Sequence, residues 1–559
     1  MSEGKSNNRK SIYICLLVIL ALSYLFLFFN LGAYSLKEPD EGRYAEIPRE
    51  MVEQGDYLVP HLNYVRYFEK PPLLYWLTAG SYKAFGVSEW SFRFPNALVA
   101  LLCVLITFFF VSRWFTKRIG ILSSLMFLSS FGFFALARIV TIDMLFAFLL
   151  FASLSCFYEF YRKKRSLFLH LFFVALALAV LAKGPVAVIL LGATILLFLL
   201  VEKKLSFLGK TLSIKGLLIF AVIAVPWFVL VCIREKEFFY FFFVDQHFLR
   251  FLTTKHHRSG PIYYFLPVLF GGLFPWSIFI PRAIIRFWRA KEMRFFLIWS
   301  LVVFGFFSLS GSKLPPYILP IFPAIAIVLA VLFERDWKER IQQNREIIVY
   351  VVFLSCIVIG GFLFGLGFFD RYLKDLAFLS RDVRGLAFGI SSVSLAILVL
   401  LGFRRMRTFG SFFFMLNAFS LTVILGLMLH VHVIDRFNTT KELAETINQT
   451  KNNAVVVSYR SFDETLPFYL GRRTYLAGTT GELEMGAKYP EARQFFLDQD
   501  RFLQLFQSGK PVFVVMKTKR LTLLREPGFE KASIVKCQDT RCMIANGPAQ
   551  AFLRAGGKP

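Results

Sequence analysis

Long apolar runs recur along most of this sequence and limit what it can fold into. Each run is long enough to cross the roughly 30 Å hydrocarbon core of a membrane as a helix. Hydrophobic residues make up 56% of the 559 positions and charged residues only 18%, so a single water-soluble core is excluded. We predict a polytopic α-helical membrane protein. About thirteen transmembrane helices are expected, over residues 12–29, 94–112, 119–136, 144–161, 167–182, 185–201, 216–233, 262–281, 295–310, 317–333, 347–368, 384–403 and 411–431.

Basic residues predict the orientation of these helices. The net charge of +27 would indicate nucleic-acid binding in a soluble protein, but here the Lys and Arg residues form short clusters in every second loop. Such clusters stay on the cytoplasmic side, which predicts a cytoplasmic N-terminus and, with an odd number of spans, a C-terminus outside. No nucleic-acid partner is expected. The clusters lie within residues 5–10, 113–118, 162–165, 203–215, 282–294, 335–345 and 404–407.

The first apolar run follows a basic start, as a signal peptide does. No small-residue cleavage site follows it, so we interpret residues 12–29 as a retained helix, with a cleaved leader as the alternative.

The character of the sequence changes after His432, where hydropathy falls. We predict a transmembrane domain over residues 1–432 and a small α/β domain outside the membrane over residues 433–559. Within it, "TTKELAETINQT" and "DETLPFYLG" read as helices, and "NAVVVSY" and "KPVFVVMK" read as strands. The "DQD" stretch, residues 498–500, is expected to begin a helix rather than to hold a metal and a nucleotide.

Five of the seven cysteines lie in apolar runs, where a thiol packs as a small hydrophobe. The other two, Cys537 and Cys542, could close a disulfide in an oxidising compartment. Metal ligation by this pair is less expected, because no second Cys/His pair accompanies it. In the apolar run 347–368, Gly361 and Gly365 form a G-x-x-x-G pattern that permits close helix packing.

Charged and phenolic residues collect in the loops opposite the basic clusters. If the predicted topology holds, all these loops face one compartment and can meet in one cavity. The first loop offers Asp40, Arg43, Tyr44, Tyr67, Glu69 and Lys70, and later loops add Asp143, His247, His257, Arg258, Lys313 and Tyr317.

This residue set suits the transfer of a sugar from a polyprenyl phosphate. No phosphate-binding loop, dinucleotide fingerprint or nucleophile elbow is present, so the activated substrate is expected to be carried by a lipid rather than a nucleotide. Cations stabilise the phosphate leaving group, and Lys70, Arg258 and Lys313 are the candidates. Carboxylates can steady an oxocarbenium-like sugar or activate an acceptor. Asp40 and Asp143 are predicted to do so, with Glu69 as a third carboxylate.

Each of these residues also has a simpler interpretation. Asp40 could be a solvated loop carboxylate, and Asp143 could only cap its helix. Lys70 precedes two prolines and could lie in an extended turn. The histidines fit interfacial roles better than metal ligation, although a divalent ion shared by His247 or His257 with a carboxylate stays open. Lys183, in "KGP", is expected only to form a short turn.

In their order along the chain, the motifs resemble those of the aminoarabinose transferases that modify lipid A, within the wider membrane glycosyltransferase class that includes protein O-mannosyltransferases. The resemblance covers the whole chain. It is carried by "EPDEGRYAEIPREM", "YFEKPPLLYW", "RIVTIDM", "KGP", "HFLRF", "HHRSGPIYYF" and "SGSKLPPYILP".

The resemblance implies a bacterial inner-membrane enzyme with a periplasmic C-terminal domain. Such an enzyme moves 4-amino-4-deoxy-L-arabinose from undecaprenyl phosphate to lipid A phosphates, which weakens the binding of cationic peptides such as polymyxin. It also implies that Asp40 and Asp143 are active-site carboxylates and that Tyr67, Glu69 and Lys70 line the donor cavity. In "KPPLLYW", some relatives have a different residue after the first proline, and this departure leaves the sugar open.

Two alternatives stand beside this function. One is a polyprenyl-phosphate sugar transferase that acts on another glycan or on a protein hydroxyl. The other is a secondary transporter, which would carry broken helices and charges at mid-membrane. The predicted spans are almost free of charge, which favours an enzyme whose substrates dissolve in the membrane.

Overall fold

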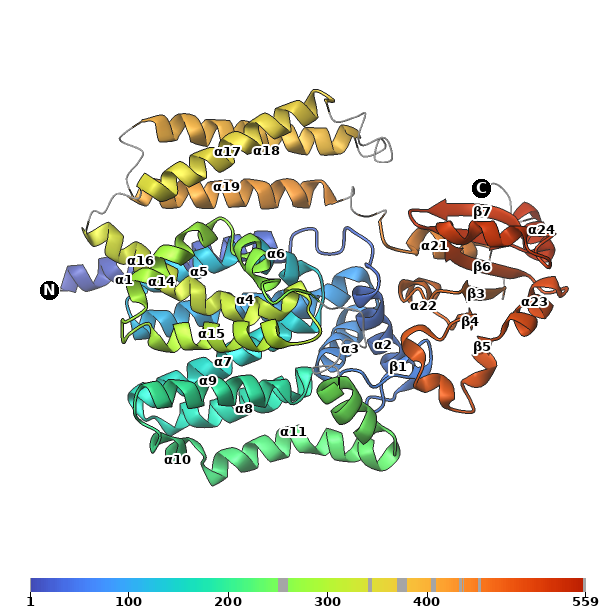
Figure 1. Ribbon diagram of the computed structural model, residues 1–559, viewed down its shortest axis with the longest axis horizontal. Coiled ribbons are helices and arrows are strands. Elements are labelled where there is room, and N and C mark those ends of the chain that lie inside the picture. Colours follow the sequence, from blue (N-terminus) through green and yellow to red (C-terminus); the bar gives the residue numbers. More distant parts are fainter. Residues whose placement is uncertain are drawn as a thin grey trace. The chain divides into compact units, whose positions relative to one another are not determined.

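The computed structural model describes residues 2–249, 260–339, 344–368, 380–403, 409–431, 435, 437–450 and 454–555. The chain divides into two compact units (Figure 1). Unit 1 comprises Met1–Leu31 and Asn96–Val433, and unit 2 comprises Gly32–Pro95 and Ile434–Pro559. The predicted division at residue 432 assigned Gly32–Pro95 to the transmembrane part, whereas in the structure this segment folds with the C-terminal residues.

The regular elements of unit 1 are all helices over the residues that the structure describes. Its helices are α1 (Ser2–Leu27), α4 (Glu89–Trp114, which begins in unit 2), α5 (Lys117–Leu128), α6 (Phe131–Arg138), α7 (Ile142–Lys163), α8 (Ser166–Lys183), α9 (Val186–Val201), α10 (Phe207–Thr211), α11 (Ile214–Arg234), η1 (Tyr240–Leu249), α13 (Phe265–Gly272), η2 (Trp276–Phe279), α14 (Ile280–Phe287), α15 (Arg294–Leu309), η3 (Pro315–Ile321), α16 (Phe322–Glu339), α17 (Asn344–Gly365), α18 (Ser380–Gly402) and α19 (Phe409–Leu429).

Among the described residues, 8 helices are long and apolar enough to cross a membrane, or up to 10 if each of two bent pairs counts as one span. Three shorter apolar helices, Leu16–Leu27, Val186–Val201 and Arg294–Leu309, coincide with further predicted spans. The chain is therefore a polytopic helical membrane protein, and the number thirteen stays a prediction.

Two predicted spans are not straight helices. Residues 119–136 form α5 and α6, which meet at 63°, and residues 262–281 contain a break of 114° after α13. At the first break, the hydroxyls of Ser129 and Ser130 donate to the carbonyls of Leu125 and Met126, a local bonding pattern that bends helices. At the second, Pro275 has no N–H to donate and disfavours helical backbone at the preceding residue.

Helices α17 and α18 pack closely through the predicted glycine pattern. A Cβ added at Gly361 would collide with Ser391, and one at Gly365 would collide with the ring of Phe388. The pattern therefore permits close helix packing, as expected.

Unit 2 contains a six-stranded mixed sheet in the order β5-β4-β3-β6-β8-β7. Neighbouring strands from β5 to β6 run parallel, and β8 runs antiparallel to both β6 and β7. Its C-terminal elements are α21 (Lys441–Gln449), β3 (Val455–Tyr459), α22 (Thr465–Leu470), β4 (Tyr475–Ala477), η6 (Gly481–Leu483), η7 (Gly486–Lys488), η8 (Arg493–Phe495), β5 (Phe496–Leu497), α23 (Gln499–Gln507), β6 (Val512–Lys517), η9 (Thr518–Arg525), β7 (Ser533–Gln538), β8 (Arg541–Ala545) and α24 (Gly547–Ala555).

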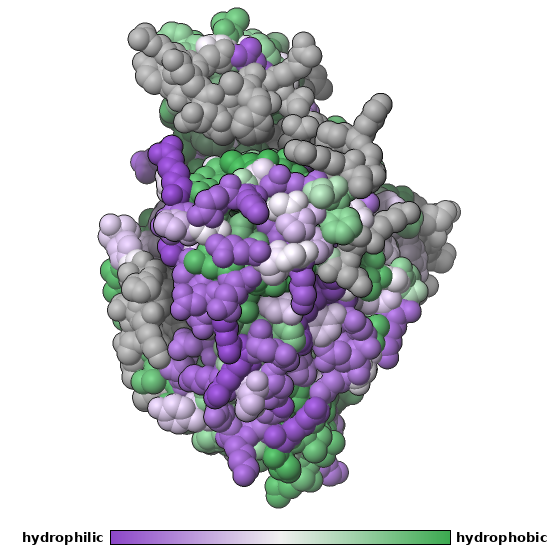
Figure 2. Space-filling model, turned by 90° about the vertical axis from the view of Figure 1, so that its right-hand side faces the viewer, coloured by the Kyte–Doolittle hydropathy of each residue, from purple (hydrophilic) through white to green (hydrophobic). Residues whose placement is uncertain are grey.

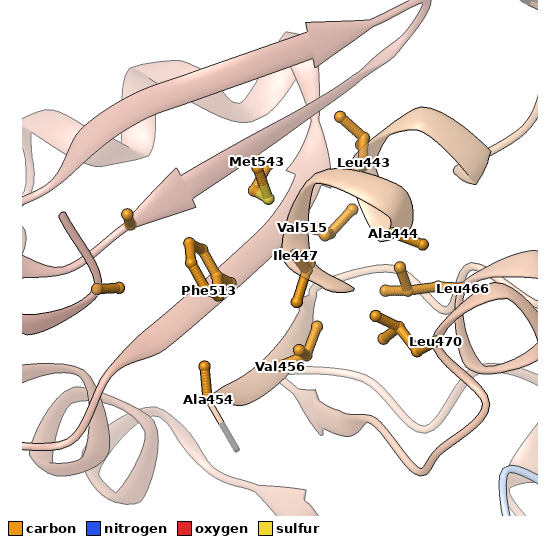
Figure 3. Packing of buried hydrophobic residues seen from close by; sticks show 12 residues of the cluster. Leu443, Ala444, Ile447, Ala454, Val456, Leu466, Leu470, Phe513, Val515 and Met543 are labelled. Carbon is orange, nitrogen blue, oxygen red and sulfur yellow. The ribbon is translucent and has the colours of Figure 1, made fainter. Parts of the chain in front are cut away.

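Alternating strand residues bury both faces of this sheet. On one face, Val456, Phe513 and Met543 pack against Leu443 of α21 and Leu466 of α22 (Figure 3). On the other, strand residues one position away, among them Val457 and Val514, pack against Phe502 and Phe506 of α23. Figure 2 shows one face of the molecule, on which hydrophilic residues predominate among those coloured by hydropathy.

Several local predictions in the C-terminal segment are confirmed. The predicted helices and strands correspond to α21, β3, α22 and β6. Asp498 caps α23 by accepting from the N–H of Arg501, as expected for a helix start. A disulfide joins Cys537 to Cys542 across the β7–β8 hairpin.

The first loop contributes the remaining elements of unit 2. They are α2 (Asp40–Gln54), the short hairpin of β1 (His61–Leu62) and β2 (Val65–Arg66), and α3 (Leu73–Phe85). Arg93, at the start of α4, is fully buried and forms an ion pair of 2.7 Å with Glu41 of α2. The segment Gly32–Pro95 is therefore an ordered, internally bonded part of unit 2.

Candidate active site

Asp40 is the first residue of α2. The N-terminal end of a helix favours a carboxylate, because the free N–H groups and the helix dipole are positive there. The Asp40 side chain is 45% exposed, and its Oδ1 lies 3.6 Å from Nη1 of Arg43, one turn further along. The carboxylate is thus held beside a cation while staying open to a ligand.

Arg43 lies at the centre of a buried polar cluster in unit 2. Its Nη2 donates to Oε1 of Glu482 at 2.7 Å. Its guanidinium carbon lies 5.8 Å from the ring centroid of Tyr44, within cation–π range. Tyr67 and Tyr75 are both almost fully buried, and Arg43, Glu69 and Glu482 all act electrostatically on their hydroxyls. Predicted site residues from two parts of the loop therefore meet around Arg43.

Three buried donor atoms of this cluster have no hydrogen-bond partner among the described residues. They are Nε of Arg43 and the hydroxyls of Tyr67 and Tyr75. Burial raises the pKa of Tyr67 well above its usual value, and the positive charge of Arg43 offsets only part of this rise, so the phenol keeps its proton. Buried donors without partners are rare in proteins. These three donors fit a ligand that brings acceptors, such as the hydroxyls or ring oxygen of a sugar.

Lys70 and Glu69 adjoin the same cluster. Nζ of Lys70 donates to the carbonyl of Glu69 at 3.1 Å, and both side chains are half-buried. Helix α3 begins three residues after Lys70, behind Pro71 and Pro72, so the predicted extended turn at Lys70 does not exclude a role in binding.

The second predicted aspartate, Asp143, lies in unit 1. It is the second residue of α7, where Thr141 holds the capping position, so Asp143 does not cap the helix. Its carboxylate contacts Nζ of Lys183, the last residue of α8. Both side chains are nearly buried, at 9% exposed for Asp143 and 12% for Lys183. Lys183 thus does more than form a turn.

Tyr317 and Lys313 lie in the same unit. Nζ of Lys183 is 4.5 Å from the ring centroid of Tyr317, which places Tyr317 beside the Asp143–Lys183 pair. Nζ of Lys313 donates to the carbonyl of Ser310 at 2.7 Å. Asp143, Lys183 and Tyr317 therefore form one group of charged and aromatic side chains.

The remaining predicted site residues cannot be placed. Arg258 and His257 lie outside the described residues, and so does the side chain of His247. Over the parts of the chain that the structure describes, no group of three His, Cys, Asp or Glu side chains is arranged to hold a metal ion. A cavity of about 260 Å³ lies elsewhere in unit 1, between α5 and α16, and contains none of the predicted residues.

Sequence reasoning missed three residues of these groups. Lys183 lies in "KGP", a motif that by itself predicts only a turn, and its position at the end of an apolar run is the available signal. Tyr75 lies in "KPPLLYW" and resembles an ordinary buried aromatic. Glu482 lies about 440 residues from Arg43 in the chain, and nothing in the sequence links the two.

Two family models match the chain. Residues 12–242 match the dolichyl-phosphate-mannose-protein mannosyltransferase model, and residues 443–546 match the aminoarabinose transferase C-terminal domain model. The second match covers most of the C-terminal sheet.

Curated relatives carry one recurring name. The chain is 30% identical over 371 residues to an undecaprenyl phosphate-alpha-4-amino-4-deoxy-L-arabinose arabinosyl transferase of Yersinia enterocolitica, covering 62% of this chain and 64% of that protein. A protein of the same name from Pectobacterium atrosepticum is 28% identical over 534 residues, covering 90% of this chain and 92% of that protein.

A solved structure matches almost the whole chain. The crystal structure of ArnT from Cupriavidus metallidurans bound to undecaprenyl phosphate has a TM-score of 0.81 and 26% sequence identity. The match covers 97% of this chain and 99% of the other.

Proposed function

We propose that this chain, a member of the aminoarabinose transferase family, transfers 4-amino-4-deoxy-L-arabinose from undecaprenyl phosphate to a phosphate of lipid A. One observation carries the proposal: nearly the entire chain shares its fold with a protein solved in complex with undecaprenyl phosphate. The reaction would take place at the periplasmic face of the inner membrane, with the N-terminus cytoplasmic and residues 433–559 periplasmic. The disulfide Cys537–Cys542 supports this orientation, since disulfides persist in oxidising compartments.

The phosphate leaving group gains charge as the anomeric bond breaks. Fixed cations stabilise that charge more strongly in the transition state than in the bound donor. We assign this role to Lys70 and Lys313, and to Arg258 on the sequence pattern alone. Lys70 is half-buried, and partial exclusion of water strengthens the attraction of its ammonium for a phosphate.

We assign the sugar to the cluster around Arg43. Its unpartnered donors, Tyr67 and Tyr75 among them, match sugar oxygens, and the nearby carboxylates Asp40 and Glu69 match an ammonium substituent or a developing oxocarbenium ion. Tyr44 adds an aromatic face.

Asp143 is the second carboxylate of the proposed reaction. Its carboxylate forms an ion pair with Lys183, and the ring of Tyr317 lies beside the ammonium of that pair. A carboxylate held in this way can orient an acceptor or balance positive charge in the sugar. We propose that Lys183 fixes the position of Asp143.

The acceptor needs little activation if it is a phosphate. The second pKa of a phosphate monoester is about 6, so its oxygen is already anionic near neutral pH. A hydroxyl acceptor, as in the alternative transferase, would require a general base.

Purified protein in liposomes tests the function directly. The liposomes would contain radiolabelled undecaprenyl-phosphate aminoarabinose and lipid A, and mass spectrometry would detect the added aminopentose on lipid A. Asp40→Asn and Asp143→Asn should lower the rate by about 100-fold, because each removes a negative charge that stabilises the developing positive charge of the sugar, whereas Glu442→Gln, which alters a half-exposed surface ion pair, should leave it unchanged.

Other outcomes identify the alternatives. Label on a protein or another glycan would indicate a different polyprenyl-phosphate transferase, and movement of the donor across the membrane without transfer would indicate a transporter. In cells, loss of the gene should remove the aminopentose from lipid A and increase sensitivity to polymyxin, because lipid A regains negative charge.

A further inference from the structure

The stretch directly before Asp40 is bonded residue by residue to the C-terminal part of unit 2. The N–H of Ser35 donates to Oδ1 of Asp435 at 2.5 Å, and the N–H of Leu36 donates to the hydroxyl of Tyr469 at 2.7 Å. The N–H of Glu38 donates to the carbonyl of Asn438 at 2.9 Å. These partners lie about 400 or more residues away in sequence, so the C-terminal segment determines the path of this stretch.

Glu38 makes the densest of these connections. Its carboxylate accepts from the backbone N–H groups of Glu464 and Thr465, each at 2.8 Å, and from the hydroxyl of Thr465. Glu38 is 7% exposed. These three hydrogen bonds tie the backbone two residues before Asp40 to the start of α22.

The other side of Asp40 is held by close packing. A Cβ added at Gly42 would lie 2.6 Å from the backbone nitrogen of Thr465 and 2.7 Å from the backbone carbon of Glu464. Real Cβ atoms do not approach backbone this closely, so α2 and α22 touch in a way that only glycine permits. Asp40 therefore lies between two points of attachment to the same pair of residues, Glu464 and Thr465.

We propose that the C-terminal domain positions Asp40 for catalysis through a clamp made of Glu38, Gly42, Glu464 and Thr465. Glu38 is a positioning residue in this arrangement and touches no substrate. This inference rests on the proposed function, because the clamp affects catalysis only if Asp40 takes part in the sugar transfer. It gives the α/β domain of a membrane enzyme a purpose: that domain holds the stretch before Asp40 from one side, while Arg93 holds the same stretch from within the loop by donating to the carbonyls of Tyr34 and Ser35.

Loosening the clamp should lower turnover more than donor binding. A misplacement of about 1 Å can reduce a rate by about 100-fold. We expect Glu38→Gln to reduce kcat by about 10- to 100-fold, with the KM for the lipid-linked donor changed less than about twofold. The new amide would point an N–H group at one of the two backbone donors. Thr465→Val, which removes only one hydroxyl, should reduce kcat by a smaller factor, and Thr465→Ser should restore it.

Recovery of kcat in Thr465→Ser, which keeps the hydroxyl, distinguishes a positioning role of this residue from a general effect on folding. Gly42→Ala should also lower kcat, because the added methyl group pushes α2 away from α22. Glu442→Gln on α21 is the matched control, since it removes a carboxylate of the same domain at a half-exposed site. Equal kcat in wild type, Glu38→Gln and Thr465→Val would overturn the proposal, and so would a loss in Glu38→Gln that appears entirely in the donor KM.

Hydrogen–deuterium exchange provides a readout that does not depend on activity. In Glu38→Gln and Thr465→Val, peptides covering residues 36–44 should exchange faster than in wild type, while those covering β3 and β6 should be unchanged. If exchange in residues 36–44 stays at the wild-type level, the clamp is wrong. If wild type shows no sugar transfer but exchange responds as expected, the proposed function is wrong and the clamp stands as a structural device without its catalytic purpose.

Discussion

Asp40 is open to a ligand, with 45% of its side chain exposed, and the nearest cation belongs to Arg43. A carboxylate in this setting can bind a cationic sugar substituent or accept a proton from an acceptor hydroxyl. The two roles differ in their dependence on the acceptor, because a phosphate oxygen is already anionic and a hydroxyl is not.

Asp40→Asn should therefore retain more activity with a phosphate acceptor than with a hydroxyl acceptor. The amide keeps the shape of the side chain and removes its basicity. Parallel assays of the purified variant with lipid A and with a hydroxyl-bearing glycan would measure both rates. Equal losses for the two acceptors would contradict this assignment.

Substitutions of Asp143 and Lys183 should have strongly non-additive effects on the stability of the protein. Removing one partner from a nearly buried pair leaves an unbalanced charge, which costs about 3 kcal/mol or more. Lys183→Met should therefore lower the thermal midpoint and the transfer rate together. The double variant Lys183→Met/Asp143→Asn should recover stability but not activity. Thermal unfolding in detergent measures the first effect, and losses of stability that simply add in the double variant would refute the coupling.

At the scale of elements, α22 begins amid several buried carboxyl groups. Burial raises the pKa of Glu464 well above its usual value, and the neighbouring carboxylate of Glu38 raises it further. Burial also raises the pKa of Asp463, although Arg541 opposes the rise. The start of α22 thus takes up protons on folding.

The stability of unit 2 should fall as pH rises through the neutral range. Between the unfolded pKa of Glu, about 4.3, and the higher pKa of Glu464 in the fold, the folded protein binds more protons than the unfolded one, so unfolding becomes easier with rising pH. We expect Glu464→Gln to flatten this dependence. Thermal midpoints of both proteins at several pH values from about 5 to 8 would show it, and parallel slopes would count against the prediction.

The boundaries of helices and strands show which local sequence signals are sufficient to predict an element. The helix after Asp498 and the strand at 512–517 follow from a capping residue and a β-branched run. The bends after α5 and α13 did not follow from hydropathy, because Ser, Gly and Pro interrupt the helical hydrogen bonds without interrupting the apolar pattern.

At the scale of the whole molecule, the loops that carry Asp40 and Asp143 are predicted to face the same side of the membrane. The prediction comes from the alternation of basic clusters. Single cysteines introduced at exposed positions a few residues before each aspartate, Ala33→Cys and Ile139→Cys, should both react with a membrane-impermeant thiol reagent from the periplasm. Labelling of the two positions from opposite sides would end the proposal that both carboxylates serve one reaction.

The sequence alone determined the membrane character and the family resemblance, because apolar run length, basic clusters and ordered motifs are all written along the chain. It also predicts Asp40, Arg43, Tyr67 and Glu69 as site candidates, and the structure places these four in one part of unit 2. These properties depend on local chemistry, which neighbouring residues are sufficient to specify.

Only the tertiary structure decided which distant residues meet. Glu482 reaches Arg43, and Glu464 and Thr465 hold Glu38, across more than 400 positions of the chain. Such pairings depend on the path of the backbone through two segments that fold together, Gly32–Pro95 and Ile434–Pro559. No periodicity or motif within either segment indicates where the other lies in the fold. The sequence therefore predicts a separate C-terminal domain, whereas in the structure this domain forms hydrogen bonds to the stretch before Asp40.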